Sequence, residues 1–282
     1  MISGIHGTGL AVISGAAGGV GMACARLLGR SRRLLLNDFD QAALDRTVAT
    51  LTDEGYQVDA LGGDLARPDL ARNLAERADN APLDCLVNCA GLSPVQGGWQ
   101  QIVRANWSVP VNLLDAFERR IRQGTTCAMI ASVAGHLGPR EHEASRLPMT
   151  MEGGNPPEAL QSLLDRLVGD FGGSAEGHAY SVSKREVIAM CERRAQSWAE
   201  RGGRIVSISP GMIATPMGRR EVASGKRARD LLDATPCGRW GRAMDVATLV
   251  EFVVSDQAGF ITGCDIKVDG GVSARLRETA FW

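Results

Sequence analysis

The chain has 282 residues, of which 44% are hydrophobic, and its 31 basic and 32 acidic side chains leave a formal net charge of −1. This composition is typical of a folded globular protein and provides no excess of positive charge for binding nucleic acid or an anionic membrane. No apolar run approaches the length of a membrane span, and the amino-terminal segment does not resemble a signal peptide. Seven cysteines without CxxC spacing predict reduced thiols in a cytoplasmic protein.

Short apolar runs alternate with helix-length segments along the chain. The predicted strands cover residues 10–14, 33–37, 56–61, 83–88, 127–132, 204–209 and 265–269. The predicted helices lie near 20–30, 41–54, 68–79, 99–122, 180–201 and 243–255. Seven strands separated by helices predict an α/β fold with a Rossmann-type, doubly wound parallel sheet and helices on both faces. No repeat or linker divides the chain, so we expect residues 1–282 to form one domain.

The stretch from Val133 to Gly177 breaks this alternation, because it has no clear strand and is rich in glycine and proline. After "NPPE", which is typical of a helix start, five apolar residues recur at helical spacing: Leu160, Leu163, Leu164, Leu167 and Val168. We therefore expect a lid-like insertion over about 136–177 with an amphipathic helix of its own. Four other residues could wall an apolar pocket: Leu137, Leu147, Met149 and Met151. The five helical residues could instead pack the insertion onto the domain or a neighbouring subunit.

A glycine-rich loop, SGAAGGVG at 14–21, follows the first predicted strand. Gly15, Gly19 and Gly21 allow a tight turn and close approach of the backbone, while the next helix offers free N–H groups to a diphosphate. Asp38 ends the second predicted strand, where a carboxylate would bind a ribose diol and repel a 2′-phosphate. The loop and the carboxylate predict a dinucleotide site that prefers NAD(H) over NADP(H). The alternative is that Asp38 only caps a helix.

Further motifs follow in a fixed order: GDL at 63–65, NCAG at 88–91, RAN at 104–106, ASVAG at 131–135, YSVSK at 180–184 and PGMIATPM from Pro210. With the glycine loop, this set resembles the short-chain dehydrogenase/reductase family, in its short, single-domain branch. Ser14 and Cys89 depart from the usual threonine and asparagine, and Cys24 stands where the epimerase-type branch has glycine. The long insertion is similar in layout to that of bacterial 3α-hydroxysteroid dehydrogenase/carbonyl reductase enzymes.

The resemblance implies a catalytic set of Asn106, Ser132, Tyr180 and Lys184. Hydride transfer between an alcohol carbon and nicotinamide requires a proton to leave or join the oxygen, and Tyr180 can exchange it if its pKa falls well below 10. Lys184 lies one helical turn further on, where its ammonium favours the phenolate. Ser132 would orient the substrate oxygen. In the family, the Asn106 carbonyl is exposed by a local break in its helix and holds a water that links Lys184 to solvent.

The resemblance also implies cofactor contacts on the glycine loop, on the ends of several strands, on the catalytic helix and on the Pro-Gly turn. These are Gly15, Gly19, Val20, Gly21, Asp38, Asp64, Leu65, Asn88, Ala90, Gly91, Tyr180, Lys184, Pro210, Gly211, Ile213 and Thr215. Asp64 and Leu65 would meet the adenine. For Asn88 and for the Pro210-Gly211 turn, a purely structural role competes with cofactor binding. Residues 212–236 occupy the other position at which the family carries a substrate lid.

Together these features predict an NAD(H)-dependent oxidoreductase that interconverts a secondary alcohol and a ketone, with a hydrophobic or steroid-like substrate. The alternatives are a dinucleotide-binding regulatory protein without catalysis, and a dehydratase or epimerase on the same fold. The histidines lack metal-ligand spacing, so no catalytic metal is expected. The family commonly forms dimers or tetramers, which implies a homodimer or homotetramer here.

Overall fold

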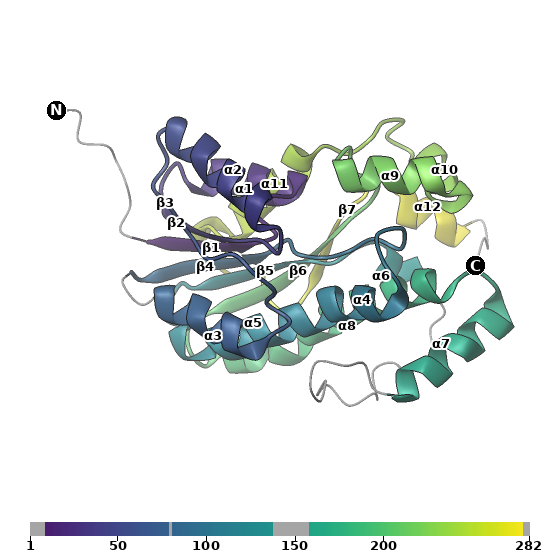
Figure 1. The fold of residues 1–282 in the computed structure, drawn as a ribbon, viewed down its shortest axis with the longest axis horizontal. Coiled ribbons are helices and arrows are strands. Elements are labelled where there is room, and N and C mark those ends of the chain that lie inside the picture. Colours follow the sequence, from purple (N-terminus) through teal and green to yellow (C-terminus); the bar gives the residue numbers. More distant parts are fainter. Residues whose placement is uncertain (1–8, 79–80, 138–157, 279–282) are drawn as a thin grey trace.

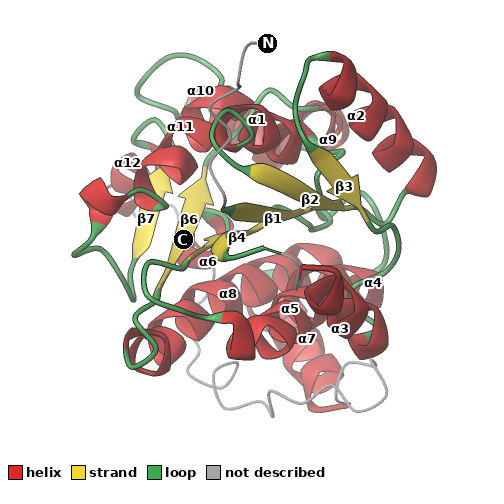
Figure 2. Ribbon diagram, turned by 90° about the vertical axis from the view of Figure 1, so that its left-hand side faces the viewer, coloured by secondary structure: helices red, strands yellow, loops and turns green. Residues whose placement is uncertain are grey.

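The computed structural model describes residues 9–78, 81–137 and 158–278. Its centre is a seven-stranded sheet in the order β3-β2-β1-β4-β5-β6-β7, and every neighbouring pair is parallel (Figure 2). The strands are β1 (Leu10–Ser14), β2 (Arg33–Asn37), β3 (Val58–Ala60), β4 (Leu83–Asn88), β5 (Thr126–Ile130), β6 (Arg204–Pro210) and β7 (Asp265–Val268). The predicted Rossmann-type sheet is confirmed. Its order reverses between β1 and β4, which is where such folds bind ligands.

Helices cover both faces of the sheet (Figure 1). On one side lie α1 (Gly19–Leu28), α2 (Gln41–Asp53) and α11 (Ala243–Val253), and on the other lie α3 (Pro68–Arg77), α4 (Trp99–Val103), α5 (Val109–Phe117) and α8 (Ala175–Ala199). Side chains alternate along each strand, so Leu10 and Val12 join one core cluster while Ala11 and Ile13 join the other. This two-sided burial explains why the central strands β1 and β5 are almost entirely apolar.

Two predicted helices differ from those observed. The predicted helix at 180–201 begins earlier, at Ala175, because the Ser174 hydroxyl accepts a hydrogen bond from the Gly177 N–H (3.1 Å) and caps the helix. Tyr180 therefore lies inside α8 rather than in its first turn. The predicted helix at 99–122 is interrupted by a π-helical turn over Arg104–Ser108.

The π-helical turn ends shortly before a proline that affects the Asn106 carbonyl. In an α-helix the carbonyl of residue 106 would accept a hydrogen bond from the N–H of residue 110. Residue 110 is proline, which has no N–H to donate. The Asn106 carbonyl therefore lacks its usual helical donor, and the expected local break in the helix is confirmed.

The insertion is described in part. It contains α6 (Ala134–Leu137) and α7 (Glu158–Phe171), and the predicted amphipathic helix is confirmed. Four leucines of α7 have at most 3% exposure and share the core cluster of α8: Leu160, Leu163, Leu164 and Leu167. These leucines thus pack α7 onto the rest of the protein. Leu137 also packs inward, against Val272 and Leu276 of α12 (Val272–Glu278). Leu147, Met149, Met151 and the "NPPE" cap lie outside the described residues.

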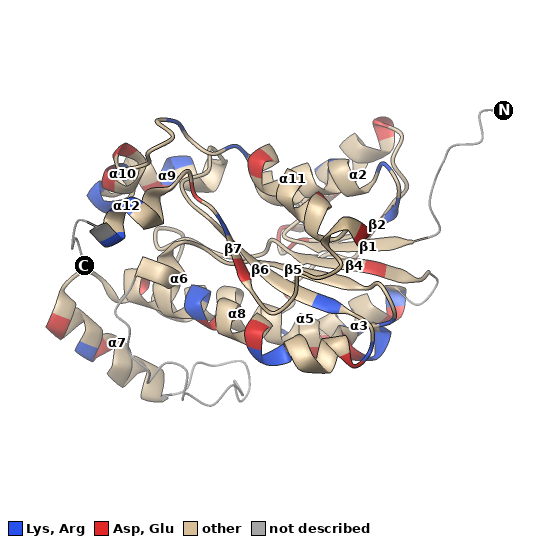
Figure 3. Ribbon diagram, turned by 180° about the vertical axis from the view of Figure 1, so that it is seen from behind, with Lys and Arg blue, Asp and Glu red and all other residues tan. Residues whose placement is uncertain are grey.

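In Figure 3 the positions of acidic and basic residues are interspersed along the helices, in keeping with the balanced composition. Among the described residues, no helix combines the length and the apolar character needed to cross a membrane. All seven cysteines are free thiols, and four of them are buried.

A buried polar cluster joins α6 to the last two strands. His136 Nε2 lies 2.7 Å from the Asp265 carboxylate, which also accepts hydrogen bonds from the hydroxyls of Ser207 (2.6 Å) and Ser209 (2.9 Å). Only 6% of the Asp265 side chain is exposed. Burial alone would raise the pKa of Asp265, but the hydrogen bonds from His136, Ser207 and Ser209 outweigh it and lower this pKa below its ordinary value.

The Asp265→Asn variant should lose about 1–3 kcal/mol of unfolding free energy at neutral pH, because the charged acceptor of this cluster is removed. A carboxyl whose pKa is lowered by folding stabilises the protein above its unfolded pKa and loses this effect as the pH falls through the folded value. The difference between the two proteins should therefore shrink toward about pH 3. Urea unfolding at both pH values measures it, with exposed Asp53→Asn as the control. Equal stability of the variant at neutral pH would contradict the assigned role of Asp265.

Candidate active site

A cavity of about 430 Å³ opens at the carboxyl edge of the sheet, next to the point where the strand order reverses. It brings together most of the site residues expected from the sequence, although they come from five separate segments of the chain. Those that line it are Gly15, Gly19, Val20, Gly21, Gly91, Ser132, Tyr180, Lys184, Pro210, Gly211, Ile213 and Thr215. Asp38, Asp64, Leu65, Asn88, Ala90 and Asn106 lie outside this lining.

The glycine loop is shaped for a diphosphate. Gly15 has a φ of +66°, and a Cβ there would lie 2.5 Å from the Ala90 nitrogen, so both its conformation and its packing require glycine. A Cβ at Gly19 would lie 2.7 Å from the Thr215 side chain across the cavity. No side chain caps the first turn of α1, and no acidic residue occupies it. The free N–H groups of this turn therefore fit an anionic phosphate.

Asp38 lies half-buried at the end of β2. One carboxylate oxygen accepts a hydrogen bond from the Ala17 N–H in the glycine loop (3.0 Å), and the other from the Asp40 N–H (3.1 Å). The neighbouring helix α2 is capped by Asp40 instead, whose side chain accepts from the Ala43 N–H. The helix-capping alternative for Asp38 is therefore wrong. Each oxygen of a carboxylate has a second lone pair, which leaves Asp38 able to bind a hydroxyl.

Three other expected cofactor residues already have structural contacts. The Asp64 carboxylate accepts hydrogen bonds from the Arg104 guanidinium (2.6 and 3.1 Å) and from the Ala66 N–H (2.9 Å). The Leu65 side chain is only 2% exposed and belongs to the core. Asn88 accepts a hydrogen bond from the Ser14 hydroxyl (2.6 Å) and thereby ties β1 to β4. Their contacts with the adenosine part of a cofactor remain predictions.

Lys184 and Tyr180 lie on one face of α8 at the cavity. The ammonium of Lys184 donates a hydrogen bond to the Ile130 carbonyl at the end of β5 (3.0 Å) and lies 5.9 Å from the centre of the Tyr180 ring. Lys184 is 6% exposed, and burial lowers its pKa to about 8. The nearby Cys89 and Glu221 side chains act in the opposite direction.

The pKa of Tyr180 differs from the sequence expectation. Burial raises this pKa above 10, the carboxyl of Glu221 raises it further, and a hydrogen bond with Ser132 lowers it only in part. In the protein alone, desolvation of the phenolate therefore outweighs the groups that favour it, and the condition stated for proton exchange, a pKa well below 10, is not met without a further positive charge.

Asn106 is buried beneath the cavity and supports it. Its side-chain amide donates to the Leu92 carbonyl (2.9 Å) and accepts from the Leu92 N–H (2.8 Å). These two bonds hold the loop after β4, in which Gly91 borders the cavity. The side chain of Asn106 thus positions this loop, while its carbonyl is left without the usual helical donor by the adjacent π-helical turn.

The sequence did not identify several residues of the site. The lid position predicted at 212–236 contains α9 (Pro216–Ser224) and α10 (Lys226–Asp233), and it supplies Met212, Met217, Glu221 and Leu231 to the cavity wall. Arg104, which pairs with Asp64, was also missed. Arg104 begins the RAN motif that ends at Asn106, and this position in the chain could have identified it. The direction in which Glu221 points depends on the start of α9, which spacing alone does not define.

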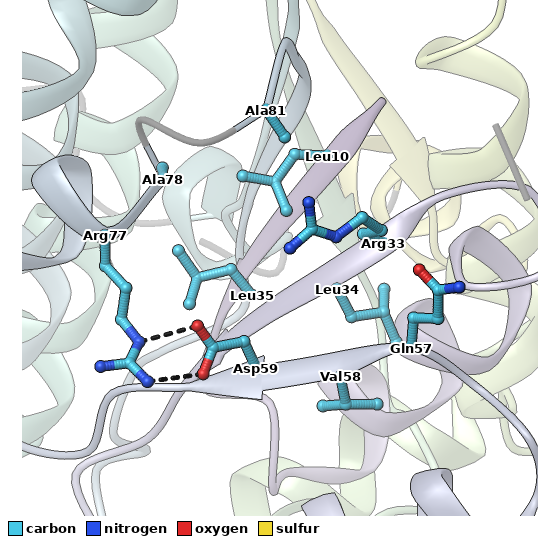
Figure 4. A pocket seen from close by; sticks show the side chains of 10 residues that line it. All are labelled: Leu10, Arg33, Leu34, Leu35, Gln57, Val58, Asp59, Arg77, Ala78 and Ala81. Carbon is cyan, nitrogen blue, oxygen red and sulfur yellow. Dashed lines mark hydrogen bonds and ion pairs between the residues drawn. The ribbon is translucent and has the colours of Figure 1, made fainter. Parts of the chain in front are cut away.

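A second cavity, of about 260 Å³, lies at the opposite edge of the sheet (Figure 4). It is lined by the first residues of β1, β2 and β3, and the Arg77 guanidinium beside it is paired with both oxygens of Asp59 (2.7 and 2.8 Å). None of the expected site residues contributes to it. Since ligands of parallel α/β sheets bind at the carboxyl ends of the strands, we place the candidate active site in the larger cavity.

Known protein families match two parts of the chain. The family description "short chain dehydrogenase" matches residues 9–144, and "Enoyl-(Acyl carrier protein) reductase" matches residues 166–273. A solved short-chain type dehydrogenase/reductase from Mycobacterium ulcerans has the same fold, with a TM-score of 0.75 at 23% identity, covering 96% of this chain and 91% of that one.

Two curated relatives are closer in sequence. Short-chain dehydrogenase/reductase bsc3 of Alternaria brassicicola is 34% identical over 275 residues, which are 94% of this chain and 96% of the relative. The 3-alpha-hydroxysteroid dehydrogenase/carbonyl reductase of Comamonas testosteroni is 30% identical over 203 residues, which are 71% of this chain and 76% of the relative. The chain therefore belongs to the short-chain dehydrogenase/reductase family of oxidoreductases.

Proposed function

We propose that the protein is an NAD(H)-dependent oxidoreductase that interconverts a secondary alcohol and a ketone, with Tyr180 as general acid and base. The observation that carries this proposal is the cavity itself. Tyr180, Lys184 and Ser132 line it together with an uncapped glycine loop that fits a diphosphate. A proton-exchanging group and a dinucleotide-binding loop at one cavity are what alcohol oxidation requires.

Each residue of the catalytic set has a distinct role in this proposal. The Tyr180 phenolate accepts the hydroxyl proton of the alcohol, and the phenol returns it in the reverse direction. Ser132, hydrogen-bonded to Tyr180, orients the substrate oxygen toward it. A bound nicotinamide would supply the hydride acceptor or donor and, when oxidised, a positive charge. The ammonium of Lys184 favours the phenolate, and Asn106 keeps the neighbouring loop in place.

The cavity walls support a hydrophobic or steroid-like substrate. Beyond Tyr180 they consist largely of apolar side chains from the loop after β4, from the end of β5 and from the α9–α10 segment: Leu92, Val133, Met212, Met217 and Leu231. The name of the Comamonas testosteroni relative points to the same substrate class. The proposal also includes a homodimer or homotetramer in the cytoplasm. Exposed Phe252 and Phe260, at 41% and 103%, support an oligomer.

Replacement of the proton-exchanging group provides the main test. Tyr180→Phe should lower kcat/KM at least about 100-fold with any secondary alcohol that the protein oxidises, because the acid–base group is lost while the ring remains. Tyr56 is the other tyrosine of the chain, and Tyr56→Phe is the matched control. NADH absorbance follows the reaction.

Each alternative function has its own outcome. Undiminished turnover in Tyr180→Phe would contradict the assigned role of Tyr180. Cofactor binding without turnover of any alcohol or ketone would favour a regulatory protein. Substrate conversion without a net change in NADH absorbance would indicate a dehydratase or an epimerase.

Gly91 should be required for activity, because the atoms packed around it leave no room for a side chain. A Cβ at residue 91 would lie 2.7 Å from Asn106 Oδ1 and 3.3 Å from Lys184 Nζ. Gly91→Ala should therefore displace these groups and lower kcat/KM by about 10- to 100-fold. Gly169 in α7 has open space around it, so Gly169→Ala should keep full activity. Equal activity of the two variants would show that the Gly91 contacts do not matter.

Cofactor preference should depend on Asp38. We expect NADH to bind at least about tenfold more tightly than NADPH, because the carboxylate repels a 2′-phosphate. Asp38→Asn keeps an oxygen that can accept from the Ala17 N–H, and it should reduce this ratio. Asp40→Asn preserves the cap of α2 and should leave the ratio unchanged. Quenching of tryptophan fluorescence measures both affinities. Equal affinities in the unmodified protein would refute the carboxylate argument.

A further inference from the structure

Among the described residues that line the cavity, one carries a carboxyl group. Glu221 of α9 lines the same cavity as Tyr180 and Lys184 and is half-buried. The start of α9 is well defined, because the Thr215 hydroxyl accepts a hydrogen bond from the Gly218 N–H (3.2 Å). A Cβ on Gly218 would lie 2.2 Å from the Ile213 carbonyl, so this turn is also closely packed. Glu221 is therefore presented by a firmly held helix.

Within the described part of the chain, the Glu221 carboxyl has no hydrogen bond or ion pair. Burial raises the pKa of Glu221 to about 7, and the positive charge of Lys184 partly offsets this rise. Glu221 in turn raises the pKa of both Tyr180 and Lys184. The carboxyl is thus close enough to act on the catalytic pair, yet its own hydrogen-bonding capacity is unused.

Glu221 lies among apolar lining residues, so its unused hydrogen-bonding capacity is available to a ligand. Ligand pockets are mostly apolar, and a few placed polar groups fix the orientation of the ligand. The apolar side chains of this cavity cannot orient a ligand by hydrogen bonds. The other charged residue that α9 places on the cavity lining, Arg220, is exposed. Arg220 does not contribute to the pKa shift of Glu221, and its charge is screened by solvent.

We propose that Glu221 determines substrate specificity: its carboxylate binds a second hydrogen-bond donor, a hydroxyl or an ammonium, on an otherwise apolar secondary alcohol or ketone, and it excludes substrates with a carboxylate or phosphate at that position. This inference rests on the proposed oxidoreductase function. A donor on the substrate replaces the water that a buried carboxylate loses, whereas an anion meets a like charge and remains unpaired. Specificity of this kind arises as much from repulsion as from attraction.

The experiment uses sets of secondary alcohols that differ in one group. Cyclohexanols with a methyl, hydroxyl, amino or carboxyl group at carbon 4 form one set, and a fused-ring frame with the same four groups forms another. Assays are run at about pH 7.5, above the pKa of Glu221 and below that of Lys184, so that the carboxyl and the ammonium are both mostly ionised. The unmodified protein should show kcat/KM at least about tenfold higher for the amino than for the carboxyl compound, mainly through KM.

Glu221→Gln should bring this ratio close to one. Because Glu221 also raises the pKa of Tyr180 and Lys184, the variant changes the basal rate for every compound, and the ratio between two compounds, in which that change cancels, is the readout. Glu221→Asp keeps the charge and should keep the preference for the amino compound. It also provides a test if the glutamine variant does not fold. Glu76 is exposed on α3, far from the site in the sequence, and Glu76→Gln should leave all ratios unchanged.

The outcomes separate this inference from the proposed function. Turnover with an unchanged ratio in Glu221→Gln would overturn the role of Glu221 and leave the oxidoreductase function standing. A preference of the unmodified protein for the carboxyl compound would also overturn that role. Failure of the unmodified protein to oxidise any member of either set would overturn the proposed function, and the role of Glu221 with it.

Discussion

The burial of a charged lysine against a strand end is the constraint on which the site depends. Lys184 is 6% exposed and has one hydrogen bond, to the Ile130 carbonyl of β5. Burial of a cation costs free energy, as the lowering of its pKa to about 8 indicates. Helix α8 offsets this free-energy cost, because it is capped at Ser174 and packs on the sheet through a continuous apolar core. A helix with less support would expose the ammonium to water.

The same constraint explains the arrangement around Lys184. Gly91 has to be glycine because Lys184 and Asn106 approach it closely, and Asn106 holds the loop that contains Gly91. Asn106 in turn lies in a π-helical turn, and Pro110 lacks the N–H that its carbonyl would accept in an α-helix. The side chain of Asn106 thus holds the loop beside the lysine, while its carbonyl is left without an α-helical donor. Gly91, Asn106 and Lys184 are thus far apart in the sequence but pack against one another in the fold.

This arrangement also shows what can be predicted from the sequence. The sheet and the site edge follow from local patterns, since buried strands are apolar throughout and glycine loops follow their strand directly. A structural role for Asn88 was one of the alternatives, but its partner, the Ser14 hydroxyl 74 positions away, could not be predicted from spacing. The hydrogen bond from Asn112 to the Leu65 carbonyl, 47 positions away, depends on the fold in the same way. The desolvation that raises the pKa of Tyr180 depends on everything packed around the ring, and no motif contains that information.

The two alternatives for the insertion have different outcomes. The leucines of α7 pack inward against α8, as one alternative stated. Of the four candidates for an apolar pocket wall, Leu137 packs on α12, and the other three lie outside the described residues. In the described part of the chain, α9 and α10 provide the walls beside Tyr180 instead. Packing of α7 can stabilise α8, and so the catalytic pair, without contacting a substrate. Under the role proposed for Glu221, substrate choice depends on this short segment after β6, in which one carboxyl lies among apolar side chains.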